Sequence, residues 1–247
     1  MLVHSDTAGV ARLGLSPSEF IDTLLEIVGP EGTLVMPSHP VLRERDGRLF
    51  YDVQKSPSSV GLVTELFRRR TGVRRSAFPY SAAAATGPLA DAVIGSHAQS
   101  TRPHDGLSPY AKLAQLDGRV LCVGCALDRM TILHVAEDEL PPNHQIPGFY
   151  DSVSVTVKSG ENLRVVDAEV RAPWLWWYLH LTRWNQEMLR NKLAIQIAGT
   201  PTSCYVAEAR KIVDWMRSDF QQKKGLYPLA KLNRWLRLGE PAFAKAE

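Results

Sequence analysis

The chain has 247 residues, of which 45% are hydrophobic and 22% are charged, and its formal net charge is +3. This composition predicts a globular protein large enough for one sizeable domain, and it excludes a chain that is disordered throughout. The mild positive charge does not indicate nucleic acid as a partner. No apolar run is long enough to span a bilayer, and the N-terminus lacks the pattern of a secretory signal, so we expect a cytoplasmic protein.

The cysteines predict neither a disulfide framework nor a metal centre. The chain has three of them, an odd number. Cys122 and Cys125 form a CxxC motif inside an apolar run that is typical of a buried strand, and a zinc site would need a second pair of ligands at matched spacing. We therefore expect small core thiols and no metal, with redox or metal chemistry as the alternative.

The first elements in chain order alternate between strand and helix. A strand over 1–4 is expected to end in a polar turn over Ser5-Asp6-Thr7. Ser16-Pro17-Ser18-Glu19 supplies an N-cap, a first-turn proline and an acidic first turn, and apolar residues then follow at helical spacing to Val28. After Gly29-Pro30 comes a short buried strand over 33–37. The order strand, helix, strand predicts a mixed α/β sheet flanked by helices.

The central part of the chain predicts a loop and then further helices and strands. Residues 38–59 are rich in charges and turn formers and predict a polar loop. A helix is expected over 61–70 and another over 109–116, followed by a strand over 119–125. Ala82–Ala85 is a run where only small side chains let another backbone or a ligand approach. A further helix is expected to begin at Asp128 or Thr131 and to end near Leu140.

The last hundred residues have a different character. Strands over 152–158 and 163–166 are expected to pair across a glycine turn. Residues 171–190 contain four tryptophans, which could stack on sugar rings but are more typical of a core or an interface. Two short strands over 193–197 and 203–206 and a helix over 207–220 complete a single domain of residues 1–220.

Residues 221–247 form a basic C-terminal tail with three possible roles. It could be a solvated helix, an arm that forms a homodimer, or a patch for an anionic partner. The third role would permit peripheral membrane contact, although no transmembrane segment is predicted. It would also suit an amino sugar carried on a nucleotide or a lipid diphosphate, because such acceptors are anionic.

His134 and Glu137 form the pattern that indicates chemistry most directly. Residues three apart on a helix lie on one face. Glu137 can therefore bind one ring nitrogen of His134, fix the tautomer and leave the other nitrogen to act as a base. Alone, this spacing also fits an ordinary pair on a helix surface. The other histidines, His97, His104, His144 and His180, have no partner pattern, and we expect no catalytic role for them.

Ordered segments around this pair resemble the aminoglycoside 3-N-acetyltransferase family of antibiotic N-acetyltransferases, which differ in fold from the GNAT enzymes. The matches cover roughly residues 1–140, and a weaker match follows at 207–215. The segments are Val3-His4-Ser5, residues 29–37, Val60-Gly61, residues 65–68, Arg75-Ser76, Gly87-Pro88, Ser108-Pro109, residues 117–121 and residues 131–137.

The resemblance implies roles for particular residues. His134 matches the catalytic histidine of the family and Glu137 matches the glutamate that orients it. Acetyl-CoA, the implied co-substrate, would lie against the loop after Ser5, the strand end around Thr33 and the small-residue stretch that begins at Ser81. Ser38 and His39 match a position that lines the acceptor pocket.

The implied activity is acetyl transfer from acetyl-CoA to an amine. His134 would take a proton from the acceptor nitrogen as it attacks the thioester, and N–H or O–H groups would stabilise the developing oxyanion. The acceptor would be a small-molecule amine, and no covalent enzyme intermediate is needed.

Three departures from the family pattern favour an acceptor other than a classical aminoglycoside. Phe78-Pro79 replaces a His-Pro pair, which concerns the contacts to CoA. The 38–59 loop carries Arg43, Arg45 and Arg48, whereas a polycationic acceptor calls for an acidic pocket. The chain also starts inside the first matching segment, so either an N-terminal lobe is reduced or the start is late. An amino sugar used in surface-polysaccharide synthesis is the preferred acceptor.

Three alternatives remain open at this point. The chain could be a non-catalytic relative that binds CoA or a partner, it could acetylate aminoglycosides, or it could be a metal-dependent hydrolase with His134 and Glu137 as ligands.

Overall fold

The structure is a computed structural model that describes residues 1–139, 150–171 and 181–222. Its centre is a seven-stranded sheet with the order β10-β11-β7-β1-β2-β6-β5. The strands are β1 (Leu2–Ser5), β2 (Leu34–Pro37), β5 (Arg74–Arg75), β6 (Ala83–Thr86), β7 (Arg119–Val123), β10 (Ala194–Gln196) and β11 (Cys204–Glu208).

The three middle strands determine where a site can form. β1 lies between β2 and β7 and pairs with both in parallel, with Leu2 opposite Val35 and opposite Val120. The outer pairs, β2 with β6 and β7 with β11, are antiparallel. The carboxyl ends of three parallel strands therefore meet at one edge of the sheet, where α/β proteins commonly bind ligands.

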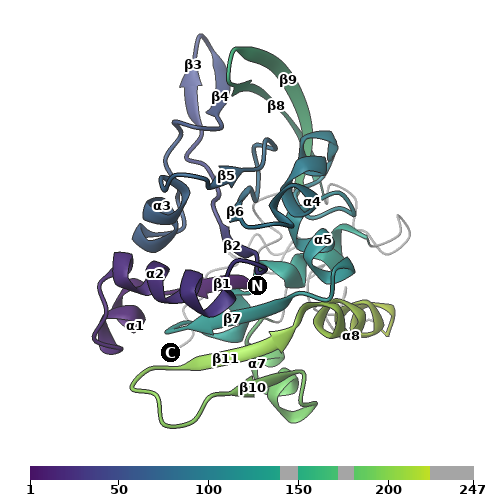
Figure 1. Ribbon diagram of the computed structural model, residues 1–247. Helices are drawn as coiled ribbons and strands as arrows, with labels where there is room; N and C mark the ends of the chain where they lie inside the picture. The colour runs from purple at the N-terminus through teal and green to yellow at the C-terminus, as the bar shows by residue number, and fades with distance from the viewer. Residues whose placement is uncertain (140–149, 172–180, 223–247) are drawn as a thin grey trace, which may run out of the picture.

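Helices cover both faces of this sheet, as the alternation of side chains along its strands requires. One face carries α1 (Thr7–Arg12), α2 (Pro17–Val28) and α3 (Leu62–Arg68), which pack on alternate residues such as Val3, Leu34 and Met36. The other face, with Leu2, Val35 and Cys122, carries α4 (Ala90–Ile94), α5 (Pro109–Gln115), α7 (Leu181–Arg190) and α8 (Ala209–Gln221). Figure 1 shows α2 and α3 on the left of the sheet and α4, α5 and α8 on the right.

The start of α2 follows from its sequence. Ser16 accepts a hydrogen bond from the Glu19 backbone N–H, and the Glu19 carboxylate accepts one from the Ser16 N–H. This capping box satisfies two N–H groups that a helix start leaves without partners. The polar turn expected over Ser5-Asp6-Thr7 is instead a helix start as well, because Asp6 caps α1 through the Gly9 N–H.

A second, four-stranded sheet corrects the prediction of a polar loop over 38–59. That segment contains β3 (Arg43–Arg45) and β4 (Arg48–Asp52), and β4 pairs in parallel with β8 (Tyr150–Ser159), which pairs with β9 (Asn162–Arg171). Tyr51 and Val53 are buried against Val155, Val157 and Phe78, so packing from a distant segment makes this stretch a strand. In Figure 1 the sheet curves away from the rest of the molecule at the top. The predicted hairpin of β8 and β9 is confirmed and is longer than expected.

The C-terminal elements agree with the predicted strands and helix. β10 and β11 pair with each other, and α8 packs on the sheet through Ile212, Met216 and Phe220. Trp184 on α7 is fully buried beside Phe220, which assigns it to the core. Trp174, Trp176 and Trp177, like residues 223–247 of the tail, lie outside the described residues.

The cysteines are thiols in the core or at its margin. Cys122 and Cys204 are buried and Cys125 is half-buried. Among the described residues, no helix is both long and apolar enough to cross a membrane.

Candidate active site

The segment that carries His134 and Glu137 is not the continuous helix expected from Asp128 or Thr131 to Leu140. It consists of two 3-10 turns, η2 (Leu127–Arg129) and η3 (Thr131–His134), and a four-residue helix, α6 (Val135–Asp138). Met130 between the turns has an extended ψ of 107°, and no side chain caps any of the three. Contacts with α5 and α8 hold the segment instead, so tertiary packing overrides its local helical preference.

The spacing of three nevertheless brings the predicted pair together. His134 Nδ1 lies 2.9 Å from Glu137 Oε2, and the two side chains are only 12% and 1% exposed. A buried carboxylate at this distance keeps the proton on Nδ1, so Nε2 is the nitrogen that exchanges protons with a substrate. This is the geometry of a histidine base with its orienting carboxylate.

Arg171, at the end of β9, is a third member that the sequence did not indicate. Its Nη1 lies 2.7 Å from Glu137 Oε2, and its Nη2 lies 3.3 Å from His134 Nδ1. A protonated Nδ1 donates to Glu137 and cannot accept from Arg171, and the shorter contact and the negative charge favour the bond to Glu137. Arg171 therefore acts on His134 mainly through the carboxylate.

The charge state of Glu137 results from opposing effects. Burial acts to raise its pKa, but Arg171 and His134 oppose burial and hold the pKa below its ordinary value. Glu137 is therefore ionised at neutral pH, as an orienting carboxylate must be.

His104 lies beside His134, although the sequence suggested no role for it. The two ring centroids are 5.1 Å apart. His104 Nδ1 is 3.3 Å from Asp138 Oδ2, and Asp138 Oδ1 accepts a 2.8 Å hydrogen bond from the Tyr150 hydroxyl. These partners come from the segment before α5, from α6 and from β8, so no local pattern connects them.

Two further histidines come from the strand ends. His4 follows the same alternation as Leu2 and Cys122 and so faces α5 and α6. Burial lowers its pKa to about 4, and nearby His134 adds to the shift. His39, predicted to line the acceptor pocket, contacts the Tyr110 hydroxyl at 3.3 Å, and burial lowers its pKa to about 3. Both rings are neutral at neutral pH.

Three of the predicted serines lie at this edge of the sheet. Ser5 ends β1, and Ser38 follows β2 on the neighbouring strand. The Ser38 N–H donates to Ala82 O at 2.7 Å, which places Ser81 beside the end of β2. Arg75 donates to Ser38 O and to Ser56 O and so fixes this corner. The run Ala82–Ala85 is fully buried, so these small side chains serve the core.

Thr33 lies at the other end of β2. Its hydroxyl accepts a 2.9 Å hydrogen bond from the Leu89 N–H, and its carbonyl accepts one from the N-terminal ammonium at 2.6 Å. Thr33 therefore joins the N-terminal end of β2 to the turn before α4, and its contact with CoA stays a prediction.

Several buried polar atoms around the histidines have no hydrogen-bond partner among the described residues. They are His4 Nε2, Ser5 Oγ, Ser38 Oγ, His104 Nε2 and Glu137 Oε1. A buried polar group that makes no hydrogen bond costs about 1–3 kcal/mol. A structure tolerates such atoms together at the place where it binds a polar ligand.

Phe78 and His97 show what the departure from the His-Pro pattern does. Phe78 is fully buried, with its ring centroid 5.0 Å from that of His97. His97 contacts Ser76 Oγ at 2.9 Å and Pro103 O at 3.3 Å, so both its ring nitrogens have partners. Phe78 thus belongs to the core of the second sheet, and His97 has the structural role expected for it. His144 and His180 lie outside the described residues.

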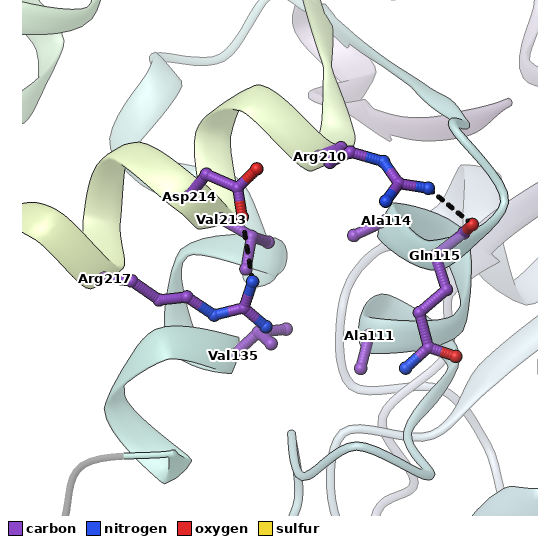
Figure 2. A pocket seen from close by; sticks show the side chains of 8 residues that line it. All are labelled: Ala111, Ala114, Gln115, Val135, Arg210, Val213, Asp214 and Arg217. Atoms are coloured by element: carbon purple, nitrogen blue, oxygen red, sulfur yellow. Dashed lines mark hydrogen bonds and ion pairs between the residues drawn. The ribbon is translucent and has the colours of Figure 1, made fainter.

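Two cavities flank this region. Figure 2 shows one of about 60 Å³ between α5, α6 and α8, where Arg210 donates to Gln115 O and Arg217 pairs with Asp214. It is too small for a substrate, since ligand pockets measure about 300–1,000 Å³. The other, of about 400 Å³, is lined by Arg12 and residues 196–203. It lies at the carboxyl edge of the sheet, because the loop before β11 meets the end of β7 there.

Comparisons with known proteins agree with this fold and site. A sequence model of the aminoglycoside 3-N-acetyltransferase family matches residues 2–221. Aminoglycoside N(3)-acetyltransferase IV of Salmonella sp. is 40% identical over 139 residues, which cover 56% of this chain and 51% of that protein. Aminoglycoside N(3)-acetyltransferase VIII of Streptomyces fradiae is 32% identical over 154 residues, which cover 56% and 54%. The chain thus aligns with about half the length of these curated relatives.

Solved structures are similar over more of the chain. The apoenzyme of aminoglycoside acetyltransferase AAC(3)-IVa has a TM-score of 0.72 at 28% identity, covering 93% of this chain and 85% of that one. AAC-IIIb in its binary complex with CoASH has a TM-score of 0.76 at 23% identity, covering 91% and 90%, which shows the fold.

Fold and site together define an α/β protein of the antibiotic N-acetyltransferase type, with a buried histidine–carboxylate pair at the carboxyl edge of its sheet. The chain belongs to the aminoglycoside 3-N-acetyltransferase family. The predicted family and fold class are confirmed.

Proposed function

We propose that this protein is an acetyl-CoA-dependent N-acetyltransferase that acts on the amine of an amino sugar. His134 is the general base, and Glu137 orients it. The observation that carries the proposal is the buried pair at 2.9 Å, stabilised by Arg171, in a chain of this family. Acetyl-CoA supplies the acetyl group as a thioester, which an uncharged amine can attack.

The chain's own residues hold and move the proton in this reaction. Nδ1 of His134 donates to Glu137, so Nε2 takes the proton of the acceptor nitrogen. Glu137 stabilises the imidazolium that results. A positioned base of this kind contributes about 100-fold to 10,000-fold in rate.

The polar atoms at the sheet edge suit acetyl-CoA. The hydroxyls of Ser5 and Ser38 and Nε2 of His4 are buried and have no partner among the described residues, and they can bind amide and carbonyl groups of a long co-substrate. The cavity beside Arg12 lies at the same edge and gives such a molecule room to extend. No group of three histidine, cysteine, aspartate or glutamate side chains within the described ranges could hold a metal ion.

The structure weakens the charge argument against a polycationic acceptor. Arg43, Arg45 and Arg48 belong to the exposed β3–β4 hairpin, where Arg45 stacks on Phe50, and they do not contact the histidines. The carboxylates beside His134 are Glu137 and Asp138. Solved relatives bind a gentamicin and apramycin, so aminoglycosides and other amino sugars are both supported as acceptors.

One experiment tests the proposal and narrows the acceptor class. The purified protein is mixed with acetyl-CoA and a panel of free amino sugars, sugar nucleotides, gentamicin and apramycin, and free thiol is measured over time. We expect thiol release that depends on the acceptor, with an N-acetyl product confirmed by mass spectrometry. Thiol release that is equal with and without every acceptor would contradict the proposal.

Replacing His134 by alanine tests the base. We expect kcat to fall by about 100-fold or more, because the reaction loses its proton acceptor. His134→Gln serves as a second variant that keeps the volume and polarity of the side chain but cannot take a proton. Both variants should retain the circular dichroism spectrum and a Tm close to that of the parent. Full activity in a folded His134→Ala protein would remove His134 from the mechanism.

A further inference from the structure

A second histidine–carboxylate pair lies against the first. His104 Nδ1 is 3.3 Å from Asp138 Oδ2, and the rings of His104 and His134 are 5.1 Å apart between centroids. Glu137 and Asp138 are consecutive residues of α6, so one short helix holds both imidazoles. Neither the sequence pattern nor the proposed function has used His104.

The bonds of Asp138 show which nitrogen of His104 can exchange a proton. Asp138 Oδ2 also accepts the His104 backbone N–H at 2.8 Å, and Oδ1 accepts the Tyr150 hydroxyl at 2.8 Å. Burial acts to raise the pKa of Asp138, but the bonds from His104 and Tyr150 outweigh burial and lower it, so Asp138 is ionised. The facing Nδ1 therefore carries a proton, and Nε2 carries the lone pair. This Nε2 is buried and has no hydrogen-bond partner in the described part of the chain.

The surroundings of His104 keep it ready to accept a proton. Burial lowers its pKa, Asp138 opposes this effect, and His134 and Arg171 add to the lowering. The ring is therefore neutral at neutral pH. Besides Asp138 and Tyr150, the titratable or charged groups around the ring are His134, Arg171, Tyr110, His39 and His97.

The stoichiometry of acetyl transfer calls for two proton acceptors, an argument that rests on the proposed function. A protonated amine reacts with the thioester by forming an N–C bond and breaking the C–S bond. The products are the N-acetyl amine, the thiol of CoA and one proton. The nitrogen thus loses two protons, of which one reaches the sulfur and the other reaches solvent. One imidazole can hold only one of them at a time.

We propose that His104 is the second proton acceptor of this site. Its Nε2 takes the proton by which the bound ammonium differs from the reactive amine, and Asp138 stabilises the imidazolium. His134 then takes the proton that the nitrogen releases during attack and passes it to the departing sulfur. Two neighbouring imidazolium ions repel each other, so His104 gives its proton to solvent before His134 takes the second one.

A pH profile distinguishes this role from a structural one. His104→Gln and the parent are compared by kcat/KM for gentamicin, or for the acceptor with the fastest thiol release if the parent does not acetylate gentamicin. At pH 7 we expect a loss of about 100-fold, because the variant lacks an acceptor for the ammonium proton. The loss should shrink steadily toward about pH 9.5, where solution already delivers a neutral amine.

Asp138→Asn and Tyr150→Phe test the same role without removing the imidazole. We expect smaller losses in kcat/KM with the same pH dependence, and these two variants decide the matter if His104→Gln does not fold. A loss that is equal at every pH, or no loss, overturns the role of His104 while the proposed function stands. A parent protein that acetylates no amine overturns both.

Discussion

At the scale of single residues, Arg171 is the side chain on which the state of Glu137 depends. The two are 2.7 Å apart and are 8% and 1% exposed. Removing one partner of a buried ion pair leaves an uncompensated charge and typically costs about 3–5 kcal/mol. We therefore expect Arg171→Met to lower the free energy of unfolding by this order and to reduce kcat, as measured by urea denaturation and thiol release.

The pH dependence of this loss has a definite sign. The pKa of Glu137 is lowered in the folded state, so its contribution to stability is present above the ordinary carboxyl pKa and is lost as pH falls through the folded value. The stability difference between parent and Arg171→Met should therefore be largest near neutral pH and should narrow below about pH 4.5. Adding Glu137→Gln to Arg171→Met removes the uncompensated charge and should recover part of the loss. A difference that grows on acidification would contradict this account.

The sequence revealed only those site residues that are close together along the chain. His134 and Glu137 could be found because a spacing of three puts side chains on one helical face. His104, Tyr150 and Arg171 reach the same place from the segment before α5 and from the β8–β9 hairpin. Their contacts depend on the tertiary fold, so no periodicity in one sequence could have identified them.

At the scale of elements, α1 and the end of β7 approach closely through two glycines. A Cβ added at Gly9 would lie 2.4 Å from the Gly124 Cα, and Gly124 itself has a φ of 71°. Gly9→Ala should therefore push α1 and Asp6 away from the sheet edge, costing about 1–3 kcal/mol of stability. Because Ser5 lies at this edge, we also expect a higher KM for acetyl-CoA, measured by thiol release.

Gly95→Ala is the matched control for that substitution. Gly95 has helical dihedral angles, and no atom lies within 4 Å of the added methyl group. Alanine there should raise stability by about 0.4–1 kcal/mol by restricting the unfolded chain, and it should leave KM unchanged. Equal effects of the two substitutions on Tm and KM would show that the contact between Gly9 and Gly124 is unimportant.

Elements with strong local signals were predicted well, and those that depend on distant partners were not. α2 has a capping box and apolar residues at helical spacing, and both persist in the structure. β3 and β4 have charged, exposed residues such as Arg43 and Glu44, and only pairing with β8 makes β4 a strand. The predicted helix around His134 fails for the same reason, since contacts with α8 shape it as short turns.

At the scale of the whole molecule, the described domain is complete at α8. The family match ends at residue 221, and Phe220 near the end of α8 is buried in the core beside Trp184. The residues that follow carry Lys223, Lys224, Lys231, Arg234, Arg237 and Lys245 against Glu240 and Glu247. We therefore predict that residues 1–220 form the domain and that the basic tail is separate from it.

Ending the chain after Gln222 tests this division. We expect the shortened protein to unfold cooperatively at the Tm of the parent, because α8 and its contacts with the sheet remain. Its kcat and its KM for gentamicin should match those of the full chain, whereas binding to vesicles that contain anionic lipid should weaken if the tail provides that attraction. A second shortened chain, ending after Arg217, removes Phe220 and should lose stability by about 3–5 kcal/mol, the usual cost of removing a buried aromatic side chain. A large drop in Tm already in the chain that ends at Gln222 would show that the tail packs on the domain.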